Sequence, residues 1–446
     1  MMKRLLTAVL LLCAVALPAL AEKTPIPEVL CFTQETLARE DVRADVYIQR
    51  TYPHTASAQV DAEMRQVIDD LVEAGRPMLP TGRIERDKSY LRASAGVSRT
   101  GESWMSFLSL ARIQHEREQI YVDFDARAYD MATGRRLAMD DLFAPDSEGW
   151  ALMARAVRTQ LSAYFPEETC DEAALDALCT PEALAETPFT LTGGSLRLHY
   201  RADALYPGHH TLMHVRLLYP DIRHAMRPEA QRQTDNSRYH LAALTFDDGP
   251  AQLYSINVID TLRNHGADAT FFLVGNMMAA NHYVLAYEQD AGFVQAYHSY
   301  EHRVSGRIRE TAHEELERFN RELSAVTGVT ATMMRAPGGM EAPYIEVNIG
   351  LPLIHWSVSS GDGNENRDYT DSVITTIGHN AGGGAKDGAV IMMHDLRRVC
   401  HQYLEVALNR LEERGFLCVT VEELFAAYGV RLAPNEVYYG AEEWAQ

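Results

Sequence analysis

Strand-like and helical patterns alternate along the second half of this 446-residue chain. The apolar runs Leu241–Thr245 and Ala269–Gly275 are typical of buried strands, and the segment between them, Leu253–His265, has apolar residues three and four positions apart. Because parallel strands need such a crossover, the alternation predicts an α/β fold on a parallel sheet, either open or closed into a barrel. The other expected elements are strands at Phe293–Tyr297, Ala331–Arg335, Leu353–Val358, Ala389–Met393 and Phe416–Val419, and helices at Tyr283–Gln289, Glu310–Val326, Cys400–Arg414 and Val421–Tyr428.

Two adjacent carboxylates end the first predicted strand. Residues 241–250 read LAALTFDDGP, so the strand delivers Asp247 and Asp248 at its C-terminal end, which is where α/β folds place their chemistry. The alternative is an ordinary strand followed by an acidic turn, because Asp-Asp-Gly-Pro also suits a turn. The partners further along the chain favour the functional interpretation.

Two histidines four positions apart follow another predicted strand. His298 and His302, in the sequence HSYEH, come directly after the predicted strand at 293–297, at the same sheet end as the two aspartates. On a helical turn this spacing would put both imidazoles on one face, close enough to share one ion. An aspartate and two histidines form a shell of three ligands that leaves zinc an open position for water. The alternative is a pair of surface histidines.

Five motifs in this order and spacing resemble the polysaccharide deacetylases of carbohydrate esterase family four, the NodB-like deacetylases. They are TFDDGP (Thr245–Pro250), ADATFFLVGN (Ala267–Asn276), HSYEH (His298–His302), RAPGG (Arg335–Gly339) and IMMH (Ile391–His394). The resemblance covers about residues 240–430. It implies a distorted (β/α) barrel and metal-dependent removal of acetyl groups from a polysaccharide.

The resemblance also implies a role for each matching residue. Asp248, His298 and His302 match the metal ligands of the family, for a divalent ion that we expect to be zinc. Asp247 matches the general base that takes a proton from the attacking water. Arg335 matches the arginine that orients this base, for which we expect a bidentate contact that also keeps the carboxylate ionised.

Two further roles follow from the resemblance. His394 matches the general acid that protonates the leaving amine, and a backbone N–H around Gly338 would stabilise the oxyanion together with the metal. Asp362 retains the second aspartate of a D-x-x-D-W pattern that the family usually has here, so it would orient His394 and raise its pKa.

The chain departs from the family pattern at four positions, all in or beside the motifs. They are Ser359 and Gly363, which stand for the first Asp and the Trp of D-x-x-D-W, Gly338, which stands for an aromatic residue, and Tyr297, which stands where Asn is common. Three of these changes, at Gly363, Gly338 and Tyr297, predict a more open groove, and an unusual substrate is compatible with them.

The first half of the chain predicts an α+β domain. Expected strands lie at Val46–Arg50, Tyr90–Val97, Ile120–Tyr129, Ser195–Tyr200 and Thr211–Leu218, with helices at Ala58–Ala74 and Glu148–Tyr164. Residues 94–226 resemble the module that precedes the deacetylase domain in some peptidoglycan deacetylases and that occurs in lysozyme-sensing anti-sigma factors. This resemblance implies a cell-envelope setting, with lysozyme as a candidate protein partner.

The N-terminus predicts export. A basic start, the apolar run Leu5–Leu20 and an Ala-Leu-Ala exit are typical of a secretory signal peptide. An uncleaved anchor is the alternative, but the run is shorter than the roughly 20 residues that a spanning helix needs. No later run is long and apolar enough to span a bilayer, so we expect a periplasmic, cell-surface or secreted protein. A net charge of −21 argues against nucleic acid as a partner.

We expect four parts in the chain: a signal peptide at 1–21, an α+β accessory domain at 22–232, the deacetylase domain at 233–430 and a C-terminal tail at 431–446. The polar stretch Arg227–Arg238 has the composition of a linker. Cleavage of the signal peptide would leave Cys31, Cys170, Cys179, Cys400 and Cys418. This odd number predicts at most two disulfides, with Cys170 and Cys179 as a candidate pair.

The expected function is removal of N-acetyl groups from amino sugars of a cell-envelope polysaccharide, with peptidoglycan as the first choice of substrate. Chitin-type oligomers and exopolysaccharides are the next choices. An O-acetyl esterase would use the same site with less help from His394, because an ester needs less protonation of its leaving group. A non-catalytic envelope-binding or lysozyme-binding protein is the other alternative.

Overall fold

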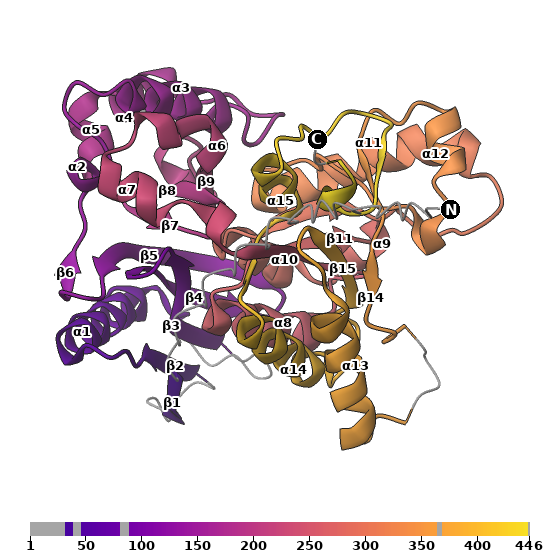
Figure 1. The fold of residues 1–446 in the computed structure, drawn as a ribbon, viewed down its shortest axis with the longest axis horizontal. Helices are drawn as coiled ribbons and strands as arrows, with labels where there is room; N and C mark the ends of the chain where they lie inside the picture. The colour runs from indigo at the N-terminus through magenta and orange to yellow at the C-terminus, as the bar shows by residue number, and fades with distance from the viewer. Residues whose placement is uncertain (1–31, 39–45, 81–88, 364–367, 445–446) are drawn as a thin grey trace, which may run out of the picture.

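The computed structural model describes residues 32–38, 46–80, 89–363 and 368–444. The predicted signal peptide at 1–21 and Cys31 lie outside these residues. Figure 1 shows the N-terminal half, in indigo and magenta, beside the C-terminal half, in orange and yellow. Over the described residues, no helix combines the length and apolar character that crossing a membrane requires.

The C-terminal half is built around strand β10. The parallel strands of its sheet run in the order β12-β11-β10-β15-β14, and β16 pairs with the start of β10. Their bounds are β10 (His240–Asp247), β11 (Ala269–Leu273), β12 (Val294–Tyr297), β14 (Val358–Ser359), β15 (Ala389–His394) and β16 (Phe416–Cys418). Strand β10 is therefore the centre from which Asp247 emerges.

Two single-residue bridges close this sheet into a distorted barrel. Met334 bridges Tyr297 on one side and Leu353 on the other, both in parallel. Leu353 begins the short strand β13 (Leu353–Ile354), whose continuation β14 pairs with β15. The structure thus confirms the α/β barrel, with the sheet joined edge to edge.

Two of the expected strands are shorter than predicted. The strand expected at 331–335 is a single bridge at Met334, and the strand expected at 353–358 is divided between β13 and β14. The division has a physical cause, because this segment changes neighbours: the His355 N–H bonds to the Tyr438 carbonyl, whereas the Ser357 N–H bonds to the Val390 carbonyl. Tyr438 belongs to β17 (Val437–Tyr438), so the segment expected as a tail adds a strand to the barrel.

Helices surround the barrel and bury its apolar side chains. They are α8 (Gln252–His265), α9 (Gly275–Met278), α10 (His282–Asp290), α11 (Ile308–Thr327), α12 (Ala342–Glu346), α13 (Asp371–Gly384), α14 (Cys400–Glu413) and α15 (Val421–Ala427). The first ends at Gly266 with φ 66°, the left-handed conformation that favours glycine after a helix. The main core joins β10 and β11 to α8 through buried residues such as Leu244, Phe271 and Ile259.

The N-terminal half is α+β, as predicted, and contains two sheets. The first has the order β1-β2-β3-β4-β5-β6 and the second the order β7-β8-β9. The strands are β1 (Phe32–Ala38), β2 (Val46–Pro53), β3 (Ser89–Thr100), β4 (Trp104–His115), β5 (Glu118–Asp130), β6 (Arg135–Arg136), β7 (Phe189–Leu191), β8 (Ser195–Arg201) and β9 (Leu212–Leu218). The helices are α1 (Ala58–Gly75), α2 (Met139–Leu142), α3 (Gly149–Leu161), α4 (Glu172–Leu178), α5 (Pro181–Glu186), α6 (Tyr219–Ile222) and α7 (Pro228–Gln233).

The two halves share apolar and charged contacts. Leu108 and Leu110 of β4 belong to the same core cluster as α8 and α10 of the barrel. Arg197 of β8 donates to Asp268 at 2.8 Å and to Glu423 at 2.8 Å across the junction, where all three side chains are buried. Because these contacts are buried, the two halves pack directly against each other and are not joined only by a flexible linker.

Two smaller predictions are wrong. The stretch expected as a linker is folded, since it forms α7 and buries Gln233 to 1% exposure. Cys170 and Cys179 are free thiols, as are Cys400 and Cys418. Helix α4 lies between the first two cysteines, and its seven residues rise about 10 Å, more than a disulfide spans.

Candidate active site and metal centre

The C-terminal ends of three parallel strands bring the predicted site residues together. Asp247 ends β10, His298 follows β12 and His394 ends β15. Since these strands run in the same direction, their carboxyl ends meet at one end of the barrel. The pairing is direct for two of the residues, because Asp247 and His394 are register partners in β10 and β15.

Asp248, His298 and His302 form a compact cluster of potential metal ligands. Their ligand atoms all lie within 4.8 Å of one another. Asp248 Oδ1 is 3.3 Å from His298 Nε2 and 3.0 Å from His302 Nε2. Among the described residues this buried oxygen has no hydrogen-bond partner, which is costly for a carboxylate. One oxygen and two imidazole nitrogens facing a common point fit a divalent cation such as zinc.

The loop that carries the two histidines is not helical, so the helical turn considered for their spacing does not form here. Ser299 and His302 have φ values of 62° and 53°, in the left-handed region that a right-handed helix excludes. The Ser299 hydroxyl accepts a hydrogen bond from the His302 N–H at 2.9 Å and so closes the loop. This turn brings the two imidazole centroids to 5.1 Å.

A backbone contact sets the orientation of His298. Its Nδ1 lies 2.8 Å from the carbonyl oxygen of Arg335, and this acceptor requires a proton on Nδ1. Nε2 is then left with a free lone pair on the side of Asp248. Such a contact to the outer ring nitrogen is typical of metal-binding histidines.

Asp247 is fixed by Arg335 beneath the cluster. Arg335 donates from Nη1 to Asp247 Oδ1 at 2.7 Å and to Thr245 Oγ1 at 2.8 Å. The expected bidentate contact is wrong, because Nε and Nη2 donate to the carbonyls of Ile354 and His355. Burial lowers the pKa of Arg335, and the Asp247 carboxylate opposes this shift. The second oxygen of Asp247 is thereby left without a contact to the guanidinium.

His394 is fixed by Asp362 on the other side of the cluster. Its Nδ1 lies 2.8 Å from Asp362 Oδ1, and its backbone N–H donates to Oδ2 at 2.8 Å. The Ser360 hydroxyl donates to the same carboxylate at 2.7 Å. Burial lowers the pKa of His394, but the hydrogen bond and charge of Asp362 outweigh it and raise the pKa to about 9. Nε2 of His394 faces Asp248 Oδ2 at 3.8 Å.

Two glycines leave space around these side chains. A Cβ at Gly363 would lie 3.2 Å from Cε1 of His394, so the missing side chain leaves that edge of the imidazole open. Gly338 lies in the turn after Arg335 with φ 62°, and its backbone is exposed. A Cβ there would come within 3.3 Å of Val304.

An aromatic wall, formed by His355, Trp356 and Tyr439, lies beside Arg335 and was not predicted from the sequence. The His355 ring stacks on Trp356 at 3.9 Å and lies 4.4 Å from Tyr439. The Arg335 guanidinium carbon is 5.7 Å from the Trp356 ring centroid, so this wall adjoins the site. Trp356 lies three residues before Ser359 in the segment WSVSSGDGN. Tyr439, in contrast, comes from the predicted tail and reaches the site only because β17 pairs with β13.

Comparisons of the sequence with known proteins give one family and several relatives. Residues 234–347 match the family model described as polysaccharide deacetylase. The peptidoglycan-N-acetylglucosamine deacetylase PgdA of Listeria monocytogenes is 32% identical over 213 residues, which are 48% of this chain and 43% of that protein. The peptidoglycan-N-acetylmuramic acid deacetylase PdaC of Bacillus subtilis is 22% identical over 322 residues, 66% of this chain and 67% of that protein. The chain thus spans less than half of the Listeria relative.

Among solved structures, peptidoglycan deacetylase PdaC from Bacillus subtilis is similar to this chain with a TM-score of 0.39 and 23% identity. The match covers 43% of this chain and 92% of that structure. The family match includes Asp247, Asp248, both histidines of the cluster and Arg335, whereas Asp362 and His394 lie beyond its end.

Proposed function

We propose that the C-terminal half of the chain is a polysaccharide deacetylase domain that hydrolyses N-acetyl groups on amino sugars of a cell-envelope polysaccharide. The observation that carries the proposal is the arrangement of three groups around one point. The Asp248, His298 and His302 cluster lies between Asp247, which Arg335 anchors, and His394, which Asp362 anchors. Amide hydrolysis needs an activated water, stabilisation of negative charge and a proton for the leaving amine, and each need has a candidate group here.

Asp248, His298 and His302 would hold a divalent metal, which we propose to be zinc. When bound, this ion supplies Lewis-acid polarisation of the acetamide carbonyl and of a nearby water molecule. The three side chains leave further coordination positions free for these groups. The backbone N–H of Gly338 is our candidate for a second donor to the oxyanion.

Asp247 is the proposed general base. Arg335 donates to Oδ1 of Asp247 at 2.7 Å, so Oδ2, which lies 4.0 Å from His298 Nε2, is the oxygen that would accept a proton from water. The four hydrogen bonds of the guanidinium fix its position, and hence that of Asp247.

His394 is the proposed general acid. With a pKa of about 9 it carries a proton on both ring nitrogens at neutral pH. Asp362 accepts from Nδ1, so the proton on Nε2 is the one that can pass to the leaving amine. After transfer, the neutral imidazole remains oriented by the same carboxylate.

We propose peptidoglycan as the polymer. Two relatives named for peptidoglycan deacetylation, with N-acetylglucosamine and N-acetylmuramic acid as the named sugars, support this choice. The wall of Trp356, His355 and Tyr439 offers an aromatic surface on which a sugar ring can stack. Export by the N-terminal segment at 1–21 would bring the enzyme to this polymer. Lysozyme binding by the N-terminal half stays a prediction, which a pull-down with purified lysozyme would test.

Mass spectrometry of peptidoglycan tests the proposed substrate. Purified peptidoglycan is incubated with the zinc-loaded protein or with its Asp247→Asn variant, digested to disaccharide peptides and weighed. We expect fragments that have lost acetyl groups with the unchanged protein only, and fragmentation then identifies the sugar. If the protein removes acetyl groups from chitin oligomers but not from peptidoglycan, the result contradicts peptidoglycan as the substrate and supports the deacetylase activity.

A further inference from the structure

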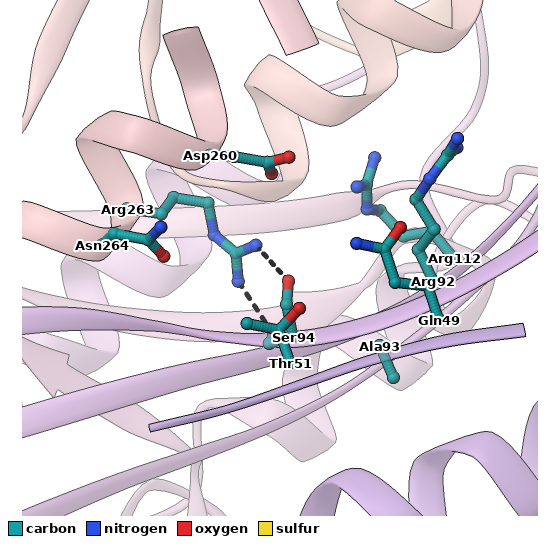
Figure 2. Close-up of a pocket in the computed structure, with 9 residues that line it drawn as sticks. All are labelled: Gln49, Thr51, Arg92, Ala93, Ser94, Arg112, Asp260, Arg263 and Asn264. Carbon is teal, nitrogen blue, oxygen red and sulfur yellow. Dashed lines mark hydrogen bonds between the residues drawn. The ribbon is translucent and has the colours of Figure 1, made fainter. Parts of the chain in front are cut away.

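A cationic cavity lies far from the cluster, between the first sheet of the N-terminal half and helix α8. It has a volume of about 180 Å³, and β2, β3, β4 and α8 contribute its lining. We call it the arginine cavity, after Arg92, Arg112 and Arg263; Asp260 is the single acidic side chain in its lining. Figure 2 shows these side chains facing the space between the strands and the helix.

Arg112 is a buried cation that forms no salt bridge within the described residues, although its charge lowers the pKa of the buried Asp290, which burial raises. Its side chain is 2% exposed, and its Nε and Nη1 have no hydrogen-bond partner in the part of the chain that the structure describes. The guanidinium carbon lies 3.0 Å above the ring centroid of Tyr287, so an aromatic face covers one side of the group. A buried charge is usually paired, because leaving water is costly for it. Its unpaired N–H groups therefore indicate room for an acceptor that none of the described residues supplies.

The other two arginines are bonded, but only to uncharged groups. Arg263 donates to the hydroxyls of Ser94 at 2.7 Å and of Tyr287 at 2.8 Å, and to the carbonyls of Ser94 and Leu108. Figure 2 shows its two contacts with Ser94 as dashed lines. Gly96 makes room for this side chain, since a Cβ there would lie 2.8 Å from its Nε. The positive charge of Arg263 thus remains uncompensated by these bonds.

The charges of the arginine cavity do not cancel. Arg92 donates to Gln114 at 3.0 Å and stacks on Tyr90, again without a carboxylate. Asp260 accepts a hydrogen bond from the Tyr287 hydroxyl and forms no ion pair with the arginines of the described residues. Three cations against one anion leave a net charge of about +2 in a protein whose overall charge is −21.

We propose that the arginine cavity binds a phosphate group. A phosphate dianion would balance the net charge, and its tetrahedral oxygens can accept hydrogen bonds from guanidinium groups that approach from different sides. Hydroxyl and amide groups of Thr51, Ser94 and Asn264 line the same space and add polar contacts. At roughly 30 Å³ per water, the cavity holds about six waters, which suits a small anion or a terminal phosphate and not a polymer chain.

Because the cavity lies between the two halves of the chain, a bound phosphate would contact both of them. Arg92 and Arg112 belong to the sheet of the N-terminal half, whereas Arg263 and Asp260 belong to α8 of the barrel. A phosphate between them would link the two halves and raise the melting temperature of the whole chain.

Phosphate titration at constant ionic strength tests the proposal. Binding of inorganic phosphate is followed by calorimetry and by ³¹P NMR, with sodium chloride as the reference anion. We expect saturable binding at one site and a higher melting temperature in phosphate than in chloride. Glycerol 3-phosphate forms the second arm: binding comparable to phosphate indicates a site for a terminal phosphate ester, and loss of binding indicates a site for the free ion.

Charge-changing variants locate the bound phosphate. Arg92→Gln, at a half-buried position, should weaken binding about tenfold, and Asp260→Asn should strengthen it about fivefold, because it removes the opposing charge but keeps an oxygen for Tyr287. Arg127→Gln is the matched control, since Arg127 pairs with Asp125 on β5 and should leave affinity unchanged. A cavity filled by water alone, with no saturable binding, would overturn the proposal. Phosphate binding whose affinity is unchanged in both Arg92→Gln and Asp260→Asn would also overturn the proposal. The ion would then be bound elsewhere, for example at the metal centre.

Discussion

His394 Nδ1 lies 2.8 Å from Oδ1 of Asp362, and the other oxygen of the same carboxylate accepts the backbone N–H of His394. Two contacts to one residue fix the position of the imidazole and the proton on Nδ1 together. Asp362 is 1% exposed, so water does not weaken the interaction. The pKa of about 9 at His394 is the direct consequence of this pairing.

Replacing Asp362 should shift the pH dependence of activity. The acid must be protonated to act, so activity is present below its pKa and is lost as the pH rises through about 9. Asp362→Asn removes the charge that raises this pKa, and the alkaline decline of kcat should move to lower pH. Ser359→Ala is the control, because Ser359 is exposed and contacts only the Gly361 N–H. An unchanged alkaline decline in Asp362→Asn would mean that His394 is not the acid.

Replacing Arg335 should be costly for stability as well as activity. Arg335→Met leaves Asp247 as a buried carboxylate without its counter-charge, which typically costs about 3–5 kcal/mol of unfolding free energy. Urea unfolding measures the loss. Arg318→Met is the matched control, since its pair with Glu322 is on the surface, where water screens it, and its loss should change stability little. Equal effects of the two variants would contradict the buried pair as the anchor of Asp247.

Removing the aromatic wall should weaken substrate binding more than catalysis. Trp356 stacks on His355 and is half-buried beside Arg335, without a place among the proposed reacting groups. Trp356→Ala should raise KM for the polymer about fivefold and change kcat little, because stacking is worth roughly 1 kcal/mol. Trp444→Ala is the control, since Trp444 is exposed and its ring contacts Tyr438 at a tilted angle, away from the His355–Trp356 stack. A fall in kcat with KM unchanged would contradict a role of the aromatic wall in substrate binding.

A histidine remote from the site should make stability depend on pH. His265 at the end of α8 faces Glu412 at 2.9 Å and Glu405 at 3.1 Å, both on α14. Burial lowers its pKa, but the two carboxylates raise it to about 9. Because this pKa lies above the value of about 6.5 in the unfolded chain, the stabilisation is complete below about pH 6.5 and is lost as the pH rises through 9.

Unfolding of His265→Gln over a pH series measures this contribution. The variant should be less stable than the unchanged protein by about 1 kcal/mol at low pH, and the difference should vanish above about pH 9. His313→Gln is the control, since His313 is exposed and contacts only the Val347 carbonyl. A difference that grows with rising pH would have the wrong sign for the proposed ion pairs.

The sequence alone predicts the residues of the candidate site better than their geometry. Asp247, Asp248 and His394 emerge from strand ends, and the strand patterns of β10 and β15 were clear. The loop of His298 and His302 was not predictable from its spacing, because the left-handed backbone at Ser299 depends on contacts with the rest of the loop. The single contact between Arg335 and Asp247 depends on two carbonyls from β13 and the residue after it, which no local pattern reveals.

Tertiary contacts explain the elements that local patterns missed. Strand β4 is buried along most of its length because α1 covers one face and the barrel covers the other, so it lacks the alternation of a half-exposed strand. The polar residues of α7 read as a linker, yet the Gln233 side chain accepts hydrogen bonds from the backbone of Glu102 and Ser103 and is buried by them. Tyr439 joins the site through a strand of two residues, which is too short to recognise from its sequence.

The most direct test of the proposed chemistry is acetate release and zinc content measured on the same sample, for the unchanged protein and for Asp247→Asn. Asp247 is the proposed base and not a ligand, so the variant should retain about one zinc per chain while acetate release falls by a factor of at least about 10². Zinc retained together with undiminished acetate release would contradict the assignment of Asp247, and absence of both zinc and acetate release from the unchanged protein would contradict the metal-dependent deacetylase itself.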